Sequence, residues 1–288
     1  MPDKQFPTGR LLFDAPAGGA WNMAVDEVLL DWAAAEEECG LRFYGWSEPT
    51  LSLGYFQPYE DRRRHPASLA CPAVRRLTGG GAIVHDAELT YSVVLCKTHP
   101  LARERNKLYE MMHGTLLEAL AEVGVCARMY REAGACLDVC GKSGGSTVKG
   151  DSPIFAAIAS DRHTKIGTVP ATIATRTAEP VLCFQRRAQD DVLVGDIKVA
   201  GSAQRRRRGD VLQHGSVLLR RSPAAPELPG LADLAPQMPS AEALAALWLR
   251  RLDGQLASRW TAGGFSAEET LLAKGLVEHR YGDFRSNE

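Results

Sequence analysis

A run of three glycines placed directly before a strand-forming segment is the feature that most limits how this chain can fold. In the stretch Arg75 to Ser92, RRLTGGGAIVHDAELTYS, residues 82–84 and 89–95 are rich in β-formers and are joined through 85–88. The glycines thus precede a strand and not a helix, so the stretch predicts a loop that feeds a β-hairpin.

Helical segments are predicted from the spacing of apolar residues and from caps. Apolar residues at helical spacing predict helices over 21–35 and 108–123. Ser240 can cap a further helix, and Ser266 with Glu269 forms a capping box on the last one.

Short β-rich runs predict the other strands, over 42–45, 50–55, 191–194, 197–200 and 211–219. Gly195-Asp196, between two of these runs, is typical of a tight two-residue hairpin. Strands adjacent in sequence are expected to pair antiparallel, with helices grouped around them. The predicted fold class is α+β, with a mixed, largely antiparallel sheet and flanking helices.

The predicted organisation is a single domain over residues 1–288. The composition, 45% hydrophobic and 24% charged, is typical of a folded protein with a sizeable core. We expect the core over about 10–220 and C-terminal helices over about 240–282. Residues 132–179, rich in Gly, Ser, Thr and Ala, carry no sustained period and are expected to form a long loop or insertion.

Charge and cysteine usage limit the partners and the compartment. The net charge of -1 balances 34 basic against 35 acidic residues, so no global field favours nucleic acid or a membrane surface. No run of about 18 apolar residues offers a membrane span, and the first residues lack the pattern of a signal peptide. Seven scattered cysteines, an odd number, predict free thiols in a reducing, cytoplasmic setting.

The glycine stretch admits two interpretations. Glycine lets backbone amides approach an anion closely, and Arg75 and Arg76 supply positive charge, so the loop could cradle a phosphate. A glycine turn between strands is the commoner case. His85, which follows, is more often a structural histidine than a catalyst. The concentration of arginines, glycines, a histidine and an acid in one loop favours a functional role.

Cys183 and Lys198 form a second candidate pair. A thiolate attacks acyl carbons well, and a neighbouring ammonium stabilises the thiolate. A cysteine between Leu182 and Phe184 is, however, more often a buried small hydrophobe. The sequence leaves both interpretations open at this point.

Four consecutive arginines, Arg205–Arg208, lie between the strand expected to end near Ala203 and the strand expected to begin at Val211. One interpretation is a solvated turn. The other is a docking patch for an acidic protein, because a local basic cluster can steer a negative partner even when the net charge is near zero.

Two other motifs are incomplete. Gly141-Lys142-Ser143 is similar to the end of a P-loop, but the glycine that a P-loop needs upstream is replaced by Cys136. Cys126, Cys136 and Cys140 lack a partner pair that would complete a tetrahedral metal site. We therefore predict no metal.

Five blocks of sequence together resemble the lipoate-protein ligases and octanoyltransferases of the biotin/lipoate ligase superfamily. The blocks are WNMAVDE at Trp21, RFYGWSEPTLSLGYFQ at Arg42, RRLTGGGAIVHDAELTYS at Arg75, LCF around Cys183 and GDIKVAGSAQRRRRGDVLQHGS at Gly195. They run in family order and are jointly more specific than any one alone. The resemblance implies a biotin/lipoate protein ligase-like catalytic domain.

The resemblance also implies the residues of the site. Cys183 corresponds to the cysteine that carries the acyl group in the octanoyltransferase branch, which this chain resembles most closely. Lys198 corresponds to the family's lysine. The residues implied to line the acyl pocket are Arg75, Arg76, Thr78, Gly79, Gly80, Gly81, His85, Gly201, Ser202 and Ala203.

The implied activity belongs to lipoate biosynthesis. An octanoyl group would pass from octanoyl-acyl carrier protein, through an acyl-cysteine, to a lysine of a lipoyl domain, expected to be the glycine cleavage H protein, with no cofactor. Two alternatives are an ATP-dependent lipoate or octanoate ligase and an amidotransferase that moves octanoyl between lipoyl domains. A non-catalytic acyl-binding protein is a third. The stretch between Val123 and Cys183 departs from the family, whose connection is usually shorter.

Overall fold

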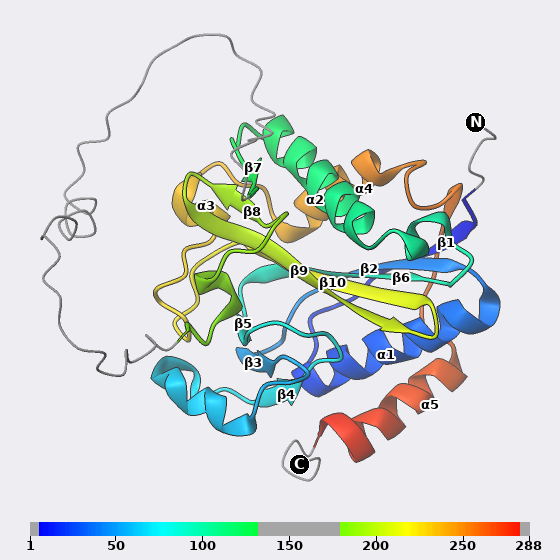
Figure 1. Cartoon of the computed structure of the whole chain (residues 1–288), viewed down its shortest axis with the longest axis horizontal. Helices are drawn as coiled ribbons and strands as arrows, with labels where there is room; N and C mark the ends of the chain where they lie inside the picture. The colour runs from blue at the N-terminus through cyan, green and yellow to red at the C-terminus, as the bar shows by residue number, and fades with distance from the viewer. Residues whose placement is uncertain (1–5, 132–178, 283–288) are drawn as a thin grey trace, which may run out of the picture. The chain divides into compact units, whose positions relative to one another are not determined.

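The computed structural model of the chain describes residues 6–131 and 179–282, and an eight-stranded sheet lies at their centre (Figure 1). Its strands, in spatial order, are β11 (Arg259–Ala262), β1 (Thr8–Phe13), β2 (Cys39–Tyr44), β6 (Glu88–Leu95), β10 (Asp210–Leu218), β9 (Ile197–Arg207), β8 (Val192–Val194) and β7 (Arg128–Met129). From β2 to β7 each neighbouring pair is antiparallel, whereas β1 runs parallel to both β2 and β11. The predicted α+β fold with a mixed, largely antiparallel sheet is confirmed.

Helix α1 (Gly19–Glu36) makes the crossover between the parallel strands β1 and β2. It was expected over 21–35, and its existence is confirmed. The helix also buries a carboxylate: Asp26 accepts hydrogen bonds from Arg42 Nη1 at 3.0 Å, Tyr44 OH at 3.0 Å and Ser92 Oγ at 2.9 Å. Burial raises the pKa of Asp26, but the hydrogen bond to His214 and the charge of Arg42 outweigh it and hold that pKa below the ordinary value. Charge as well as apolar packing therefore fixes α1 to the sheet.

The prediction that a β-hairpin follows the glycine loop is wrong. β5 (Ile83–His85) belongs to a separate three-stranded sheet with β3 (Thr50–Leu53) and β4 (Ala73–Arg75), in the order β4-β3-β5. The reason is that β6 pairs with β2 on one edge and with β10 on the other, which leaves no edge for β5. The glycine loop therefore connects two strands of the small sheet, and the chain passes to the large sheet only after His85.

The hairpin predicted around Gly195-Asp196 is confirmed. β8 and β9 pair antiparallel, with Val194 opposite Ile197. Gly195 has a φ of 57°, in the left-handed region that glycine adopts without steric cost. The hairpin places Lys198 at the start of β9.

β9 (Ile197–Arg207) continues past Ala203, near which the strand was expected to end. It turns through Arg208 and Gly209, with φ of 54° and 101°, directly into β10. Arg205, Arg206 and Arg207 therefore lie within a strand, paired with β10, because the ladder of hydrogen bonds extends to the turn. The interpretation of 205–208 as a solvated turn holds for Arg208 alone.

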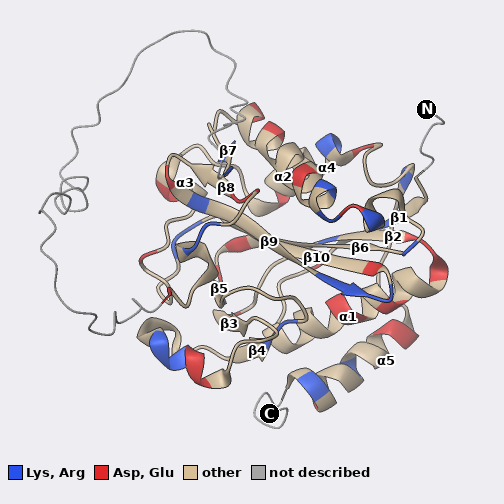
Figure 2. Ribbon diagram, viewed as in Figure 1, with Lys and Arg blue, Asp and Glu red and all other residues tan. Residues whose placement is uncertain are grey.

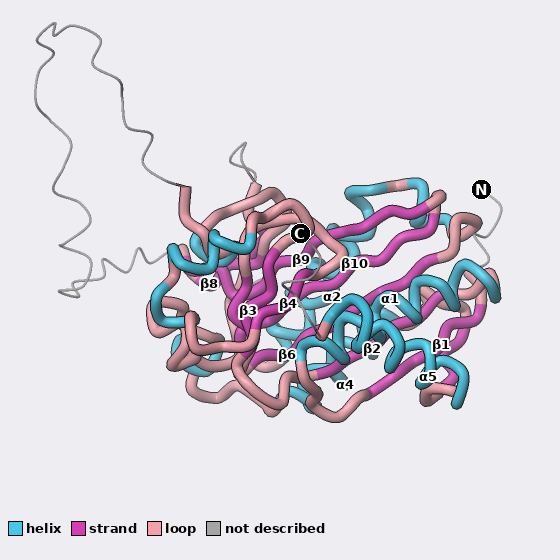
Figure 3. Tube along the Cα trace, turned by 90° about the horizontal axis from the view of Figure 1, so that it is seen from below, coloured by secondary structure: helices cyan, strands magenta, loops and turns pink. Residues whose placement is uncertain are grey.

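Helices cover both faces of the large sheet. α2 (Arg105–Glu122) and α4 (Ala241–Leu252) pack together on one face, and α1 and α5 (Ala267–Leu276) lie side by side on the other (Figures 1 and 3). Ser240 caps α4, and Ser266 with Glu269 forms the predicted capping box on α5. The short helical elements are α3 (Leu231–Leu234), the five-residue π-helix Val277–Tyr281, and the 3₁₀ turns Tyr59–Arg64, Pro66–Ser68, Pro100–Arg103 and Cys183–Gln185.

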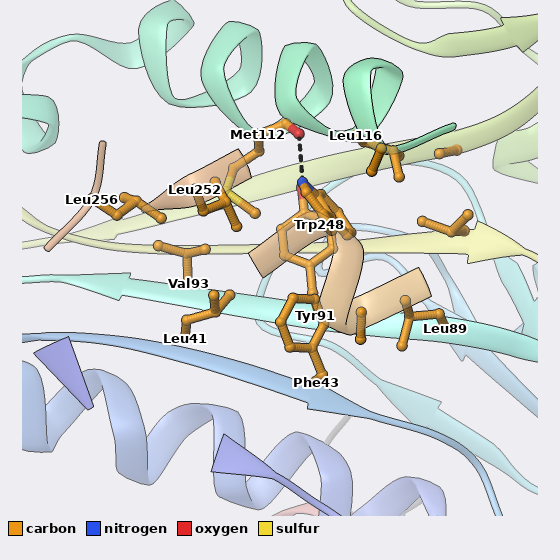
Figure 4. Packing of buried hydrophobic residues seen from close by; sticks show 14 of the residues in the cluster. Leu41, Phe43, Leu89, Tyr91, Val93, Met112, Leu116, Trp248, Leu252 and Leu256 are labelled. Atoms are coloured by element: carbon orange, nitrogen blue, oxygen red, sulfur yellow. Dashed lines mark hydrogen bonds between the residues drawn. The ribbon is translucent and has the colours of Figure 1, made fainter. Parts of the chain in front are cut away.

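The larger part of the core lies between the sheet and the pair α2 and α4 (Figure 4). Trp248 of α4 is fully buried there, and its Nε1 donates to the Met112 carbonyl of α2 at 3.2 Å. Its ring meets Tyr91 of β6 edge to face, with centroids 4.9 Å apart. This packing holds α2 against the sheet. Residues 132–178 lie outside the described part, so the single domain and its insertion stay predictions.

Candidate functional site

Cys183 lies against the end of the glycine loop, at the start of a 3₁₀ turn. Its N–H donates to the Ala82 carbonyl at 2.7 Å, and the Ala82 N–H donates to the Val181 carbonyl at 2.9 Å. A Cβ on Gly81 would stand 2.9 Å from Val181 O and 3.2 Å from Cys183 N, so this approach depends on glycine. Two segments far apart in sequence are thereby joined, and the Cys183 side chain stays partly exposed.

Lys198, carried by the β8–β9 hairpin, lies beside this thiol. Its Nζ is 3.7 Å from Cys183 Sγ and 3.3 Å from the Cys183 carbonyl oxygen. The ammonium also forms an ion pair with Asp191, with Nζ 2.8 Å from Oδ2. The structure thus brings together the two residues expected to be catalytic, and it adds a buried carboxylate to them.

Sequence reasoning missed Asp191. Burial raises the pKa of its carboxyl, and the neighbouring Lys198 opposes that effect. A Cβ on Gly201 would come within 2.9 Å of Asp191 Oδ1 and 2.7 Å of Lys198 Cε, so the ion pair depends on glycine there. In the sequence, Asp191 stands before a short apolar run, and Asp is also a common residue in exposed turns. No local signal could have separated the two cases.

Arg76 is fully buried and supports the glycine turn from inside. Its Nη2 donates to the carbonyls of Gly79 at 2.7 Å and Gly81 at 2.6 Å, and Nη1 donates to the Ser52 carbonyl at 3.0 Å. Burial lowers the pKa of Arg76 to about 10, against the opposing effect of Cys183. The guanidinium is therefore charged at neutral pH and close enough to Cys183 to interact with it.

Arg75 is also bonded to the main chain. Its Nη1 donates to the carbonyls of Gly54, Tyr55 and Gln57, at 3.2, 3.2 and 2.5 Å. Both arginines thus hold loop backbone in this structure. That they bind substrate stays a prediction.

His85 and Thr78 contact other buried side chains. His85 Nε2 is 2.7 Å from Ser52 Oγ, and its ring stacks on Trp46 with centroids 3.9 Å apart. Thr78 Oγ1 is 2.7 Å from His214 Nε2. These contacts agree with the structural interpretation of His85, and a direct role of either residue toward substrate stays a prediction.

Residues 201–203 were expected to form another wall of the acyl pocket, but their side chains point to two sides of β9. Ser202 Oγ is 2.9 Å from Nε2 of His113 in α2, whereas Gly201 lies against Lys198. Ala203, two residues after Gly201, shares its face. Of these three residues the structure places Gly201 at the Cys183–Lys198 pair, and the pocket roles of Ser202 and Ala203 stay predictions.

His113 links α2 to the turn that carries Asp191. Its Nδ1 is 2.5 Å from the Asp190 carbonyl oxygen. A carbonyl only accepts, so Nδ1–H donates, and Nε2 accepts from the Ser202 hydroxyl. Burial lowers the pKa of His113 to about 4, so the ring is neutral at pH 7. The turn at Asp190 is thereby fastened to a helix of the core.

The buried neutral His113 predicts sensitivity to acid. Unfolding restores an ordinary pKa near 6.5, so below that pH the unfolded chain binds more protons than the folded chain. The stabilisation that the neutral ring contributes is fully present above pH 6.5 and is lost as the pH falls toward 4. At about pH 4.5 the free energy of unfolding is lower by about 2–3 kcal/mol. Urea unfolding at pH 7 and at about 4.5 tests this. His113→Gln should reduce the difference between the two pH values, and an unchanged difference would contradict the assignment.

Expectations about metals, membranes and thiols can be compared with residues 6–131 and 179–282. In this part, no group of three or more His, Cys, Asp or Glu is arranged to hold a metal, and no helix is long and apolar enough to cross a bilayer. Cys39, Cys71, Cys96 and Cys183 are free. Cys126 is disulfide-bonded, so the expectation of free thiols is wrong there, because spacing in sequence does not determine which thiols meet. Cys136, Cys140 and Gly141-Lys142-Ser143 lie outside the described residues.

The mixed eight-stranded sheet with flanking helices and the small second sheet make up a lipoate/biotin protein ligase-like fold. Residues 19–225 match the family model described as the lipoyl protein ligase A/B catalytic domain. The chain belongs to that family.

Curated relatives of the chain are octanoyltransferases by name. Octanoyltransferase LipM of Geobacillus kaustophilus (strain HTA426) is 33% identical over 208 residues, which are 69% of this chain and 61% of that protein. Octanoyltransferase LipM of Bacillus subtilis (strain 168) is 31% identical over 219 residues, 75% of this chain and 66% of that protein. The matched region thus spans just under two thirds of these relatives.

Solved structures agree with the fold. The putative lipoate protein ligase Ta0514 from T. acidophilum with bound lipoic acid is 19% identical, with a TM-score of 0.62, and the match covers 94% of this chain and 95% of that one. Lipoate-protein ligase A bound with ATP is 18% identical, with a TM-score of 0.61 and 96% of both chains covered. At such identities the likeness concerns the fold alone.

Proposed function

We propose that this protein is an acyltransferase that moves an octanoyl group from octanoyl-acyl carrier protein to a lysine of a lipoyl domain, such as that of the glycine cleavage H protein. The observation that carries the proposal is the 3.7 Å distance between Lys198 Nζ and Cys183 Sγ at the end of the glycine loop. The names of the curated relatives, octanoyltransferases at 31–33% identity, support the same reaction.

The reaction has two steps. The Cys183 thiolate attacks the octanoyl thioester, a new carbon–sulfur bond forms, the bond to the carrier's sulfur breaks, and that sulfur takes up the proton that Cys183 gave up. The Lys198 ammonium stabilises the thiolate, and backbone amides stabilise the oxyanion. The neutral amine of the acceptor lysine then attacks the acyl-cysteine, an amide forms, and Cys183 regains its proton. Thioester to thioester is nearly even in energy and thioester to amide is downhill, so no ATP is needed.

A cationic face near the glycine loop supports an acidic donor. A cavity of about 730 Å³ is lined by Arg75, Arg76, His279 and Arg280, and Arg280 also pairs with Glu27, with Nη1 2.8 Å from Oε1. Arg205 extends this face, since its guanidinium stacks over Tyr55, 4.5 Å from the ring centroid. Figure 2 shows the positive charge at the end of the β9–β10 hairpin. We propose that this face meets the acidic surface or phosphate of the carrier protein.

The deciding experiment is an intact mass measurement after incubation with octanoyl-acyl carrier protein without ATP. The proposal expects an octanoyl adduct that hydroxylamine removes, followed by transfer to the H protein. Labelling of a lipoyl domain by free octanoate that requires ATP, with no adduct from the carrier, would instead establish a ligase. An adduct formed from an octanoylated lipoyl domain, and none from the carrier, would establish the amidotransferase.

The role proposed for Lys198 predicts that Lys198→Ala slows acyl-enzyme formation to an extent that depends on pH. If the ammonium stabilises the thiolate, its loss matters most at neutral pH, where the thiol is otherwise protonated, and less at alkaline pH, where thiols ionise unaided. The rate of acyl-enzyme formation from pH 6.5 to 9.5 checks this, with rates falling about 10–100-fold at neutral pH and less at the alkaline end. An equal loss at every pH would show that Lys198 only positions its neighbours.

A further inference from the structure

The proposed acyl-cysteine would place an electrophile next to a buried amine. The carbonyl carbon of an acylated Cys183 is bonded to Sγ, and Lys198 Nζ is 3.7 Å from Sγ. Because the carbonyl carbon is one bond from Sγ, it can come within the attack distance of about 3–3.5 Å from Nζ. If Lys198 were neutral, its nitrogen would attack this carbon, the carbon–sulfur bond would break, and the proton released from nitrogen would pass to the Cys183 sulfur. The product, an octanoyl amide on Lys198, would end the catalytic cycle.

Protonation of Lys198 prevents this reaction, because an ammonium has no lone pair with which to attack. Before acylation, the Cys183 thiolate is an anionic partner for the ammonium. Acylation removes that charge, and a buried ammonium without an anionic partner tends to lose its proton. Retention of the proton on Lys198 therefore requires an anion that persists in the acyl-enzyme.

Asp191 is that anion. Its Oδ2 is 2.8 Å from Lys198 Nζ, and the two side chains are 5% and 3% exposed, so solvent does not screen the pair. The Asp191 carboxylate is also held in place: the Ala188 N–H donates to Oδ2 at 2.7 Å. His113 fastens the preceding Asp190, which has a φ of 71°, through its carbonyl. The absence of a side chain at Gly201 leaves room for both partners.

We propose that Asp191 keeps Lys198 protonated while Cys183 carries the acyl group, and so prevents transfer of the octanoyl group from Cys183 to Lys198. Asp191 is a positioning residue, which acts through Lys198 and does not touch the acyl group. The proposal rests on the acyl-cysteine of the proposed function.

The test is Asp191→Asn incubated with octanoyl-acyl carrier protein, with the adduct analysed before and after hydroxylamine. The amide of asparagine can still accept from the Ala188 N–H, so the fold should survive, and Asp191→Ala provides a second neutral variant. We expect an octanoyl adduct that resists hydroxylamine, mapped to Lys198 by tandem mass spectrometry, at least about tenfold above wild type.

Two variants control this experiment. Asp196→Asn removes a carboxylate from the same hairpin, but Asp196 is 76% exposed and pairs with Arg128, so its adduct should be fully labile to hydroxylamine, as in wild type. Asp191→Asn combined with Lys198→Met should lose the resistant adduct. A labile adduct on wild type together with no resistant adduct on either Asp191 variant would overturn this inference alone. No adduct on wild type would overturn the proposed function, and the inference with it.

Discussion

Replacing Cys183 by serine should reduce octanoyl transfer by about 1,000-fold or more, because the nucleophile changes from a thiol to a hydroxyl that does not ionise at neutral pH. The substitution changes little else: the Cys183 N–H that donates to Ala82 belongs to the backbone and is retained. The hydroxylamine-labile thioester should disappear from the intact mass. Transfer to the H protein, followed with octanoyl-acyl carrier protein, gives the size of the loss.

Cys71→Ser is the matched control for this substitution. Cys71 is another free thiol, but it is buried and burial raises its pKa, so it should not carry the acyl group. That variant should form the adduct at the wild-type rate. If Cys183→Ser kept full transfer, or if the adduct mapped to Cys71, the assignment of the nucleophile would be wrong.

Gly54→Ala should destabilise the protein by about 2–3 kcal/mol and distort the glycine loop. A Cβ on Gly54 would stand 2.1 Å from the Gly80 carbonyl oxygen, which is backbone and cannot rotate away. The turn cannot retreat without loss, because Arg76 holds the carbonyls of Gly79 and Gly81. Urea unfolding measures the free energy, and acyl-enzyme formation should fall with it, since the loop is joined to the segment of Cys183.

Gly79→Ala is the control for stability. A Cβ on Gly79 would have no heavy atom within 4 Å, and Gly79 is not among the residues with positive φ. Its free energy of unfolding should therefore stay within about 0.5 kcal/mol of wild type. Equal stability of the two variants would show that the loop can move away from Gly54 at no cost.

Several elements could be predicted from the sequence because their signals are local. The capping box of Ser266 and Glu269 is a contact within one helical turn, and Gly195-Asp196 needs only its two flanking strands. β1 and β11 gave no comparable signal and were missed. They are parallel partners whose pairing depends on segments far away in the chain.

The candidate site, too, could be predicted from the sequence only in part. Cys183 and Lys198 were candidates because of their chemistry and their place in the resemblance, and the structure places Nζ 3.7 Å from Sγ. Arg75 and Arg76 were expected to face a ligand, whereas the structure shows both of them bonded to loop carbonyls. A cationic side chain in a glycine-rich segment is compatible with either role, and only the surrounding backbone decides.

The sequence by itself therefore determined the helices with local periodicity and caps, the tight hairpin, the family resemblance and the candidate nucleophile. The tertiary structure decided which sheet each strand joins, because β6 has both edges occupied and β5 must pair elsewhere. It also decided which side chain pairs with Lys198. The carboxylate of Asp191 lies 2.8 Å from the ammonium only because the β8–β9 hairpin, Gly201 and the core helix α2 bring it there, and these contacts join segments that are distant in the chain.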